Sequence, residues 1–223
     1  MNTALRIDFR MSIPMPLDGE PSQFIVEYCG RILDMGSEDE PEGHRTRTAG
    51  RIRATRIHVG LAEEHAENLL DVFDAHSQEM LELYEAIFDH ETDEIWDSVA
   101  EKTSGQDVLF VNSIELLPRY RGRRLGLQAL QRTMEFLGTG CAVTVVEAHP
   151  IDYDQVQDER WVQRMRLKRF KRDVDAAAKR LRQYWSRLGF KRAGRTNYLT
   201  FDMAYRFKQV AEPNVDTPDV PLH

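Results

Sequence analysis

The segment from Val108 to Leu137 limits the possible folds more than any other part of the chain. Its first part, Val108 to Leu117, is an apolar run closed by Pro118, and this pattern predicts a buried strand. Its last part, Arg123 to Leu137, has apolar residues at helical spacing and is followed by Gly138, which predicts an amphipathic helix. A strand that enters a helix through so short a turn indicates a mixed α/β fold.

The turn between this strand and this helix has the features of an anion-binding site. The first turn of a helix has unpaired backbone N–H groups and the positive end of the helix dipole, so a phosphate fits there. Glycine lets a ligand approach the backbone closely, and arginines add charged donors, here Arg119, Arg121, Arg123 and Arg124. An ordinary strand–helix connection with solvated arginines explains the same residues, and the residue types alone leave both interpretations open.

The other segments show further strand and helix patterns. The additional strands that we expect are 5–14, 22–35, 47–61 with a bulge or bend near Thr55 and Arg56, 141–148, 190–195 and 197–207. The additional helices that we expect are 64–88, with a break near 75–77 and Ser77 as a cap, and a long basic helix over 157–188.

The length of 223 residues suits a single domain, which we expect to span 1–207. An N-terminal sheet with its helices would occupy about 1–107, and the strand–turn–helix unit would begin the second part, 108–207. Residues 208–223 contain three prolines and little to bury, so we expect a disordered tail there.

Charge and composition narrow the classes of function. The net charge of −7 gives the whole protein no general attraction for nucleic acid or for an anionic membrane, although basic residues crowd positions 160–195. The chain has no apolar run of about 18 residues, and its N-terminus lacks the basic start and apolar core of a secretory signal. With only Cys29 and Cys141 as cysteines, the sequence predicts a protein of the reducing cytoplasm. The net charge and the lack of a long apolar run predict no membrane partner.

The strand–turn–helix segment resembles motif A of the GNAT N-acetyltransferases. That motif ends a strand with an apolar-acidic-apolar run and Pro, as in Ser113 to Pro118, and then opens a helix with a glycine-rich turn, as in Arg121 to Gly126. Arg124 stands where the family has its first glycine. The resemblance implies that this turn holds the pyrophosphate of acetyl-coenzyme A and that the strand end holds the acetyl carbonyl and the pantetheine arm. The implied cofactor-binding residues are Leu116, Leu117, Arg121, Gly122, Arg123, Arg124, Leu125, Gly126 and Leu127.

Tyr184 to Phe190 resembles the end of motif B of the same family, in which a helix runs into Leu-Gly-Phe. The two motifs stand in the family's order and mark 108–207 as the acetyl-coenzyme A-binding core. The resemblance implies a mixed, mostly antiparallel central sheet flanked by helices, with a splayed strand pair at the coenzyme site. Two departures are that Trp185 replaces the family's usual tyrosine and that three strands, instead of one, precede the first helix.

Acetyl transfer to an amine needs a group that takes a proton from the amine and donors that stabilise the oxyanion. Glu147 and His149 share a strand face by the period of two, and Glu115 lies on the strand expected beside them. These three are the candidate bases, and Tyr184 is a candidate acid. Strand-end polar residues that face solvent or pair with arginines are the alternative. The polar run 74–79 either caps a helix or lines the acceptor pocket.

The leading hypothesis is an N-acetyltransferase that moves an acetyl group from acetyl-coenzyme A, its cosubstrate, to a primary amine of a small molecule or a protein. One alternative is a GNAT-like module that binds coenzyme A without catalysis. Another is a nucleic-acid or ribosome-associated protein that uses the basic helix over 160–192. No histidine pair has metal-ligand spacing, so we expect no metal, and a homodimer stays open.

Overall fold

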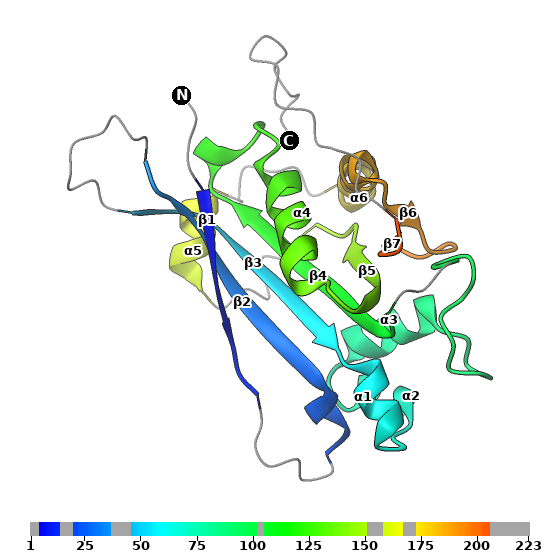
Figure 1. The fold of residues 1–223 in the computed structure, drawn as a ribbon. Coiled ribbons are helices and arrows are strands. Elements are labelled where there is room, and N and C mark those ends of the chain that lie inside the picture. Colours follow the sequence, from blue (N-terminus) through cyan, green and yellow to red (C-terminus); the bar gives the residue numbers. More distant parts are fainter. Residues whose placement is uncertain are drawn as a thin grey trace.

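The computed structural model describes residues 5–13, 20–36, 46–101, 105–150, 158–166 and 173–205. Within these ranges one sheet of seven strands has the order β1-β2-β3-β4-β5-β7-β6 (Figure 1). Only β4 and β5 run parallel, and the other neighbours are antiparallel. The strands are β1 Leu5–Met11, β2 Ile25–Asp34, β3 Arg47–Ile57, β4 Asp107–Leu116, β5 Cys141–Glu147, β6 Lys191–Arg192 and β7 Tyr198–Asp202. The expected mixed, mostly antiparallel sheet is therefore confirmed.

Helices cover both faces of this sheet. The described helices are α1 Val59–Glu64, α2 Leu69–Asp74, α3 Gln78–Ile87, α4 Leu125–Leu137, α5 Glu159–Met165 and α6 Val174–Trp185. Leu109 and Val111 of β4 belong to the same apolar cluster as the buried residues of α4, whereas Val108 and Phe110 belong to that of α2 and α3. Because β4 is buried on both faces, its sequence is a continuous apolar run rather than an alternating one.

A bulge in β4 changes which side chains face which helices. Arg53 of β3 lies opposite Ser113, but Thr55 lies opposite Phe110, so β4 carries one more residue than β3 between these two pairs. The expected irregularity near Thr55 is present, with its extra residue on β4 and not on β3. Beyond the bulge, Glu115 lies on the face that α5 covers, the opposite face from α4, as its contact with α5 shows (Figure 1).

The ladder between the parallel strands β4 and β5 ends where the bulge in β4 begins. Their ladder runs from Asp107 opposite Cys141 to Val111 opposite Val146 and ends there. From Asn112 to Leu116, β4 continues with β3 as its partner. β5 itself ends one residue later, at Glu147, so β4 runs on alone past the carboxyl end of its parallel partner. This is the edge of a parallel pair where α/β folds bind ligands.

Two of the expected element boundaries are wrong near the first helices. The strand expected over 47–61 ends at Ile57, and α1 begins within its last residues. The helix expected to begin at 64 begins at Leu69 instead, as α2, and its expected break before α3 is present at the expected place. Ser77 is confirmed as the cap of α3, because its side chain accepts a hydrogen bond from the Met80 N–H.

The single basic helix expected over 157–188 is also wrong. The first helix, α5, ends at Met165, and the next residue, Arg166, is left-handed with φ of 53°. The second helix, α6, starts afresh after Asp173, whose side chain caps it. High helix propensity in a charged segment concealed this interruption. The strand expected over 197–207 is β7, which ends at Asp202, and the expected tail 208–223 lies outside the described residues.

Candidate functional site

The turn from β4 into α4 is built from left-handed residues. After Leu117 and a single 3-10 turn, Pro118–Tyr120, the backbone passes through Gly122 with φ of 72° and Arg124 with φ of 56°. Arg124 is the N-cap of α4, and its side chain makes no capping hydrogen bond. The Arg124 side chain therefore does not occupy the first backbone N–H groups of α4, and these groups can donate to another acceptor.

Tyr184, from the end of α6, lies over this first turn of α4. Its hydroxyl accepts a hydrogen bond from the Leu127 N–H at 3.2 Å. The same hydroxyl would lie 2.8 Å from a Cβ on Gly126, so a larger residue at 126 forces the tyrosine to move. The structure thus brings the candidate acid to the proposed pyrophosphate turn and shows no contact between it and Glu147.

Arg121 directs its guanidinium inward, toward the end of β4. Its Nε donates to the Leu116 carbonyl at 2.8 Å, and its Nη2 donates to the Met165 carbonyl at 3.0 Å. The side chain thus ties the end of β4 to the end of α5. In this arrangement Arg121 contributes to the site by fixing the strand end.

Glu115 is a buried carboxylate that α5 holds in place. Its side chain accepts hydrogen bonds from the indole N–H of Trp161 and from the Ser113 hydroxyl. The Arg51 guanidinium lies 4.0 Å from the centre of the Trp161 ring and pairs with Asp158 at 2.7 Å. These contacts give Glu115 a structural role in docking α5 on the sheet.

Glu147 ends β5 beside a group of acidic side chains on α3. Burial raises the pKa of the Glu147 carboxyl, His149 lowers that pKa in part, and Glu79 and Glu82 raise it further. Tyr198, opposite Glu147 on β7, donates from its hydroxyl to the Glu79 carbonyl at 3.3 Å. A half-buried carboxylate with a raised pKa is a better proton acceptor than an ordinary one.

Asn112 lies on β4 directly after the last pair of the β4–β5 ladder, and it contacts this acidic group. Its amide donates to Glu79 at 3.4 Å and accepts from the Thr55 hydroxyl at 2.9 Å. Neither Asn112 nor Glu82 was predicted from the sequence, and Glu79 was predicted only as part of the polar run 74–79. The available signal was the polar pair Asn112 and Ser113 inside an otherwise apolar strand.

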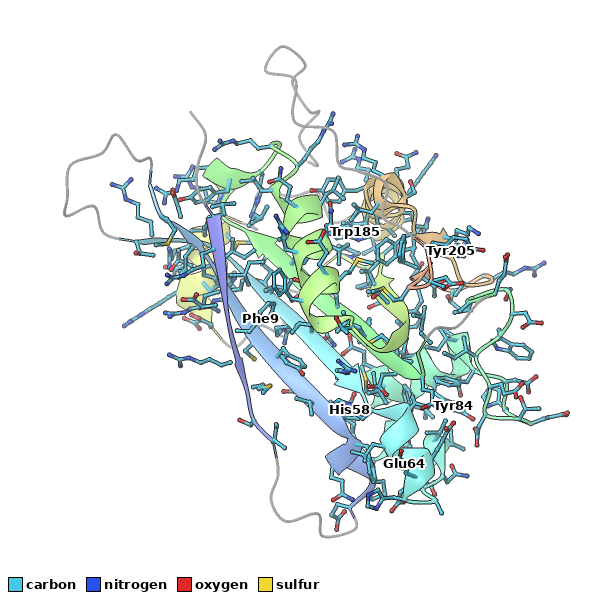
Figure 2. All side chains as sticks on the ribbon, viewed as in Figure 1. Phe9, His58, Glu64, Tyr84, Trp185 and Tyr205 are labelled. Carbon is cyan, nitrogen blue, oxygen red and sulfur yellow. The ribbon has the colours of Figure 1, made fainter. Side chains whose placement is uncertain are left out.

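Trp185 is the last residue of α6. It is 7% exposed, and its indole N–H finds no hydrogen-bond partner within the described ranges. Figure 2 shows it between α4 and α6, on the side of the molecule away from His58. A buried donor without an acceptor costs free energy, so an acceptor atom of a ligand would stabilise this site.

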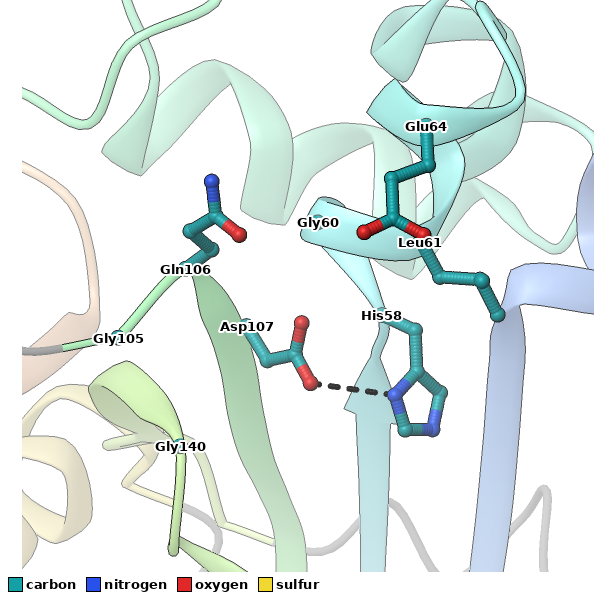
Figure 3. A pocket seen from close by; sticks show the side chains of 8 residues that line it. All are labelled: His58, Gly60, Leu61, Glu64, Gly105, Gln106, Asp107 and Gly140. Atoms are coloured by element: carbon teal, nitrogen blue, oxygen red, sulfur yellow. Dashed lines mark hydrogen bonds and ion pairs between the residues drawn. The ribbon is translucent and has the colours of Figure 1, made fainter.

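A pocket of about 690 Å³ lies at the start of β4, beside Asp107, and none of its lining residues is a predicted site residue (Figure 3). Asp107 lies there, 3.1 Å from Nδ1 of His58 and 2.7 Å from the Arg56 guanidinium. Burial raises the pKa of Asp107, but hydrogen bonds from His58 and Arg56 outweigh it and hold that pKa below its ordinary 3.8. Arg56 also donates to the Leu137 carbonyl, so this cluster joins β3 and β4 to the end of α4.

The described residues contain neither a candidate metal site nor a candidate membrane-spanning helix. No group of three or more His, Cys, Asp or Glu side chains in that part of the chain could hold a metal ion. No helix in the described ranges is long and apolar enough to cross a membrane. Comparisons with family models, with curated proteins and with solved structures give no match to this chain.

Proposed function

We propose that the chain binds acetyl-coenzyme A between the carboxyl ends of β4 and β5 and transfers its acetyl group to an amine, as a GNAT-type N-acetyltransferase does. The observation that carries this proposal is the β4–β5 ladder that ends at Val111 and Val146 while β4 runs on to Leu116, with α4 starting at Leu125 after a short turn. This combination leaves strand-end backbone groups and a helix N-terminus facing one region, which suits an elongated ligand with a phosphate at one end.

The residues present fit the coenzyme at both ends of this region. The backbone N–H groups of the first turn of α4, from Leu125 to Leu127, would hold the pyrophosphate. The Tyr184 hydroxyl, which lies close to Gly126 and accepts from the Leu127 N–H, would have to move aside for it. The end of β4, at Leu116 and Leu117, would hold the pantetheine arm. The unpartnered indole N–H of Trp185 supplies a buried donor for an acceptor atom of the ligand.

The bound coenzyme supplies an activated thioester. The amine nitrogen attacks the thioester carbonyl, so that a C–N bond forms, the C–S bond breaks and the thiolate leaves. Glu147 would take the proton from the attacking amine, because its raised pKa and its place at the end of β5 suit a base. His149 stays a second candidate, since it lies beside Glu147 and interacts with it electrostatically.

The second candidate function is coenzyme A binding without catalysis. Trp185 favours it, because an indole has no acidic phenol proton to give to the leaving thiolate. A nucleic-acid role has less support. The continuous basic helix on which it depended is divided between α5 and α6.

The experiment is a thiol-release assay with purified protein, acetyl-coenzyme A and a panel of diamines, polyamines, amino sugars and peptide amines. We expect release above the hydrolytic background with at least one amine, and a loss of about 100-fold in Glu147→Gln. Binding of acetyl-coenzyme A without release for any amine would favour the non-catalytic module. A folded protein that neither binds nor reacts would refute both candidates.

A further inference from the structure

The outer edge of β1 is open to another strand. β1 ends the sheet, and in the part of the chain that the structure describes no strand pairs with its outer side. Backbone N–H and C=O groups on such an edge can pair with a strand from another chain. On this strand and just after it, the apolar side chains of Met11 and Ile13 are 55% and 62% exposed.

The two faces of β1 have different character. Leu5, Ile7 and Phe9 lie on the α4 side and pack against the apolar cluster there, as Phe9 shows in Figure 2. Arg6, Asp8 and Arg10 alternate with them and so lie on the other face. Any strand that pairs with this edge must therefore place apolar residues on one face and charges on the other.

We propose that two copies of this chain pair antiparallel through β1 and form one continuous sheet, with a two-fold axis at Phe9. The charges select this register. An axis at Asp8 would set Asp8 against Asp8 and Arg6 against Arg10, and like charges directly opposite each other destabilise a pair of strands. An axis at Phe9 sets Asp8 of each copy against Arg10 of the other, so two opposite-charge pairs form.

The apolar face supports the same register. An axis at Phe9 places the two Phe9 rings opposite each other and sets Met11 against Ile7 of the second copy. Continuing the strand sets Ile13 against Leu5, so both exposed side chains become covered. An axis at Ile7 would also join opposite charges, Arg6 with Asp8, but would leave Met11 and Ile13 unpaired within the described residues.

The charges of one strand would then form a small network. Arg6 already pairs with Asp8 in the same copy at 2.8 Å, on an exposed surface. Arg10 of the second copy would approach Asp8 from the other side and add a second partner. Exposed ion pairs contribute little by themselves, so these charges set register while the apolar contacts and the backbone ladder supply most of the affinity.

β1 is at the edge of the sheet opposite β6, and pairing of two copies there needs no coenzyme.

Sedimentation velocity tests this interface on the full-length protein over about 1 µM to about 1 mM, a range that spans the affinities of weak dimers. Asp8→Arg and Arg10→Asp each place like charges opposite each other twice. We expect each to weaken the dimer by about tenfold or more. The double variant Asp8→Arg with Arg10→Asp exchanges the two charges and should restore the dimer. Glu85→Arg, with the same charge change on the exposed surface of α3, is the control and should leave the dimer intact.

Circular dichroism of each variant separates loss of pairing from loss of folding. A wild type that stays monomeric over the whole range would overturn the proposal. So would a dimer that both single variants leave intact, because its interface would lie elsewhere. Monomeric single variants with a monomeric, folded double variant would overturn the Phe9 axis, because the exchanged charges should restore that register. A monomeric Asp8→Arg beside a dimeric Arg10→Asp would also overturn it, since the Ile7 axis sets Arg6 against Asp8 and gives Arg10 no charged residue opposite.

Discussion

Replacing Trp161 by phenylalanine should destabilise the protein by removing the donor to a buried carboxylate. Trp161 is 2% exposed and Glu115 is 8% exposed, so water cannot replace the lost indole N–H. A buried acceptor left without its partner costs about 1–3 kcal/mol, and more when it is charged. The smaller ring adds about 1 kcal/mol for lost packing. We therefore expect the free energy of unfolding to fall by about 3 kcal/mol.

The assay is urea unfolding followed by circular dichroism at 222 nm, a probe that does not depend on tryptophan. Trp96→Phe is the matched control, because Trp96 is 41% exposed, and its cost should stay within about 0.5 kcal/mol. In a Glu115→Gln background, Trp161→Phe should cost about 1–2 kcal/mol less, since the acceptor is then uncharged. Equal costs in the two backgrounds, or a Trp161→Phe variant as stable as Trp96→Phe, would refute this account of how α5 docks.

Two further predictions concern other polar contacts. Asp107→Asn should lose about 2 kcal/mol at neutral pH. The folded-state pKa of Asp107 lies below its ordinary 3.8, so its contribution is full well above 3.8 and is lost as the pH falls from there through the folded value. Unfolding free energies of wild type and variant should therefore converge below about pH 4, and a constant difference down to pH 2 would contradict the assignment. Ser77→Ala should lower the free energy of unfolding by about 1 kcal/mol, because the Met80 N–H loses its side-chain acceptor; no loss in urea unfolding would argue against this cap.

The parts of the fold that the sequence predicted well are those with strong local patterns. The apolar run of β4 and the spaced leucines of α4 placed both elements to within two residues of their observed bounds. Ser77 was recognisable as a cap because a polar residue there precedes an apolar helical pattern. The pairing of β4 with β5 followed from the resemblance and not from these patterns.

The errors arose where tertiary contacts decide the structure. Asp158 and Asp173 each cap a helix, but among so many charged residues neither was recognisable as the start of a new one. The apolar residues Val59 and Leu61 extended a strand pattern by two-residue spacing, whereas the chain turns there into α1.

The candidate site was predicted less completely than the fold. Glu115 was predicted as a candidate base, and its hydrogen-bond partner Trp161 was not predicted. Trp161 lies 46 residues further along the chain, in the segment where one continuous helix was expected. His58 and Asp107 are 49 residues apart, and neither stands in a recognisable motif. Long-range pairs of this kind leave no periodic signal, because the sheet and not the local sequence brings them together.

Isothermal titration with acetyl-coenzyme A tests the central claim most directly. The wild type, Gly126→Trp and Arg132→Ala should be compared, since the Arg132 side chain is 70% exposed on α4 and serves as the control. We predict saturable binding to the wild type and to Arg132→Ala, and loss of binding in a folded Gly126→Trp variant, whose side chain would fill the first turn of α4. No binding to the folded wild type, or equal binding to Gly126→Trp, would contradict a coenzyme site at this turn.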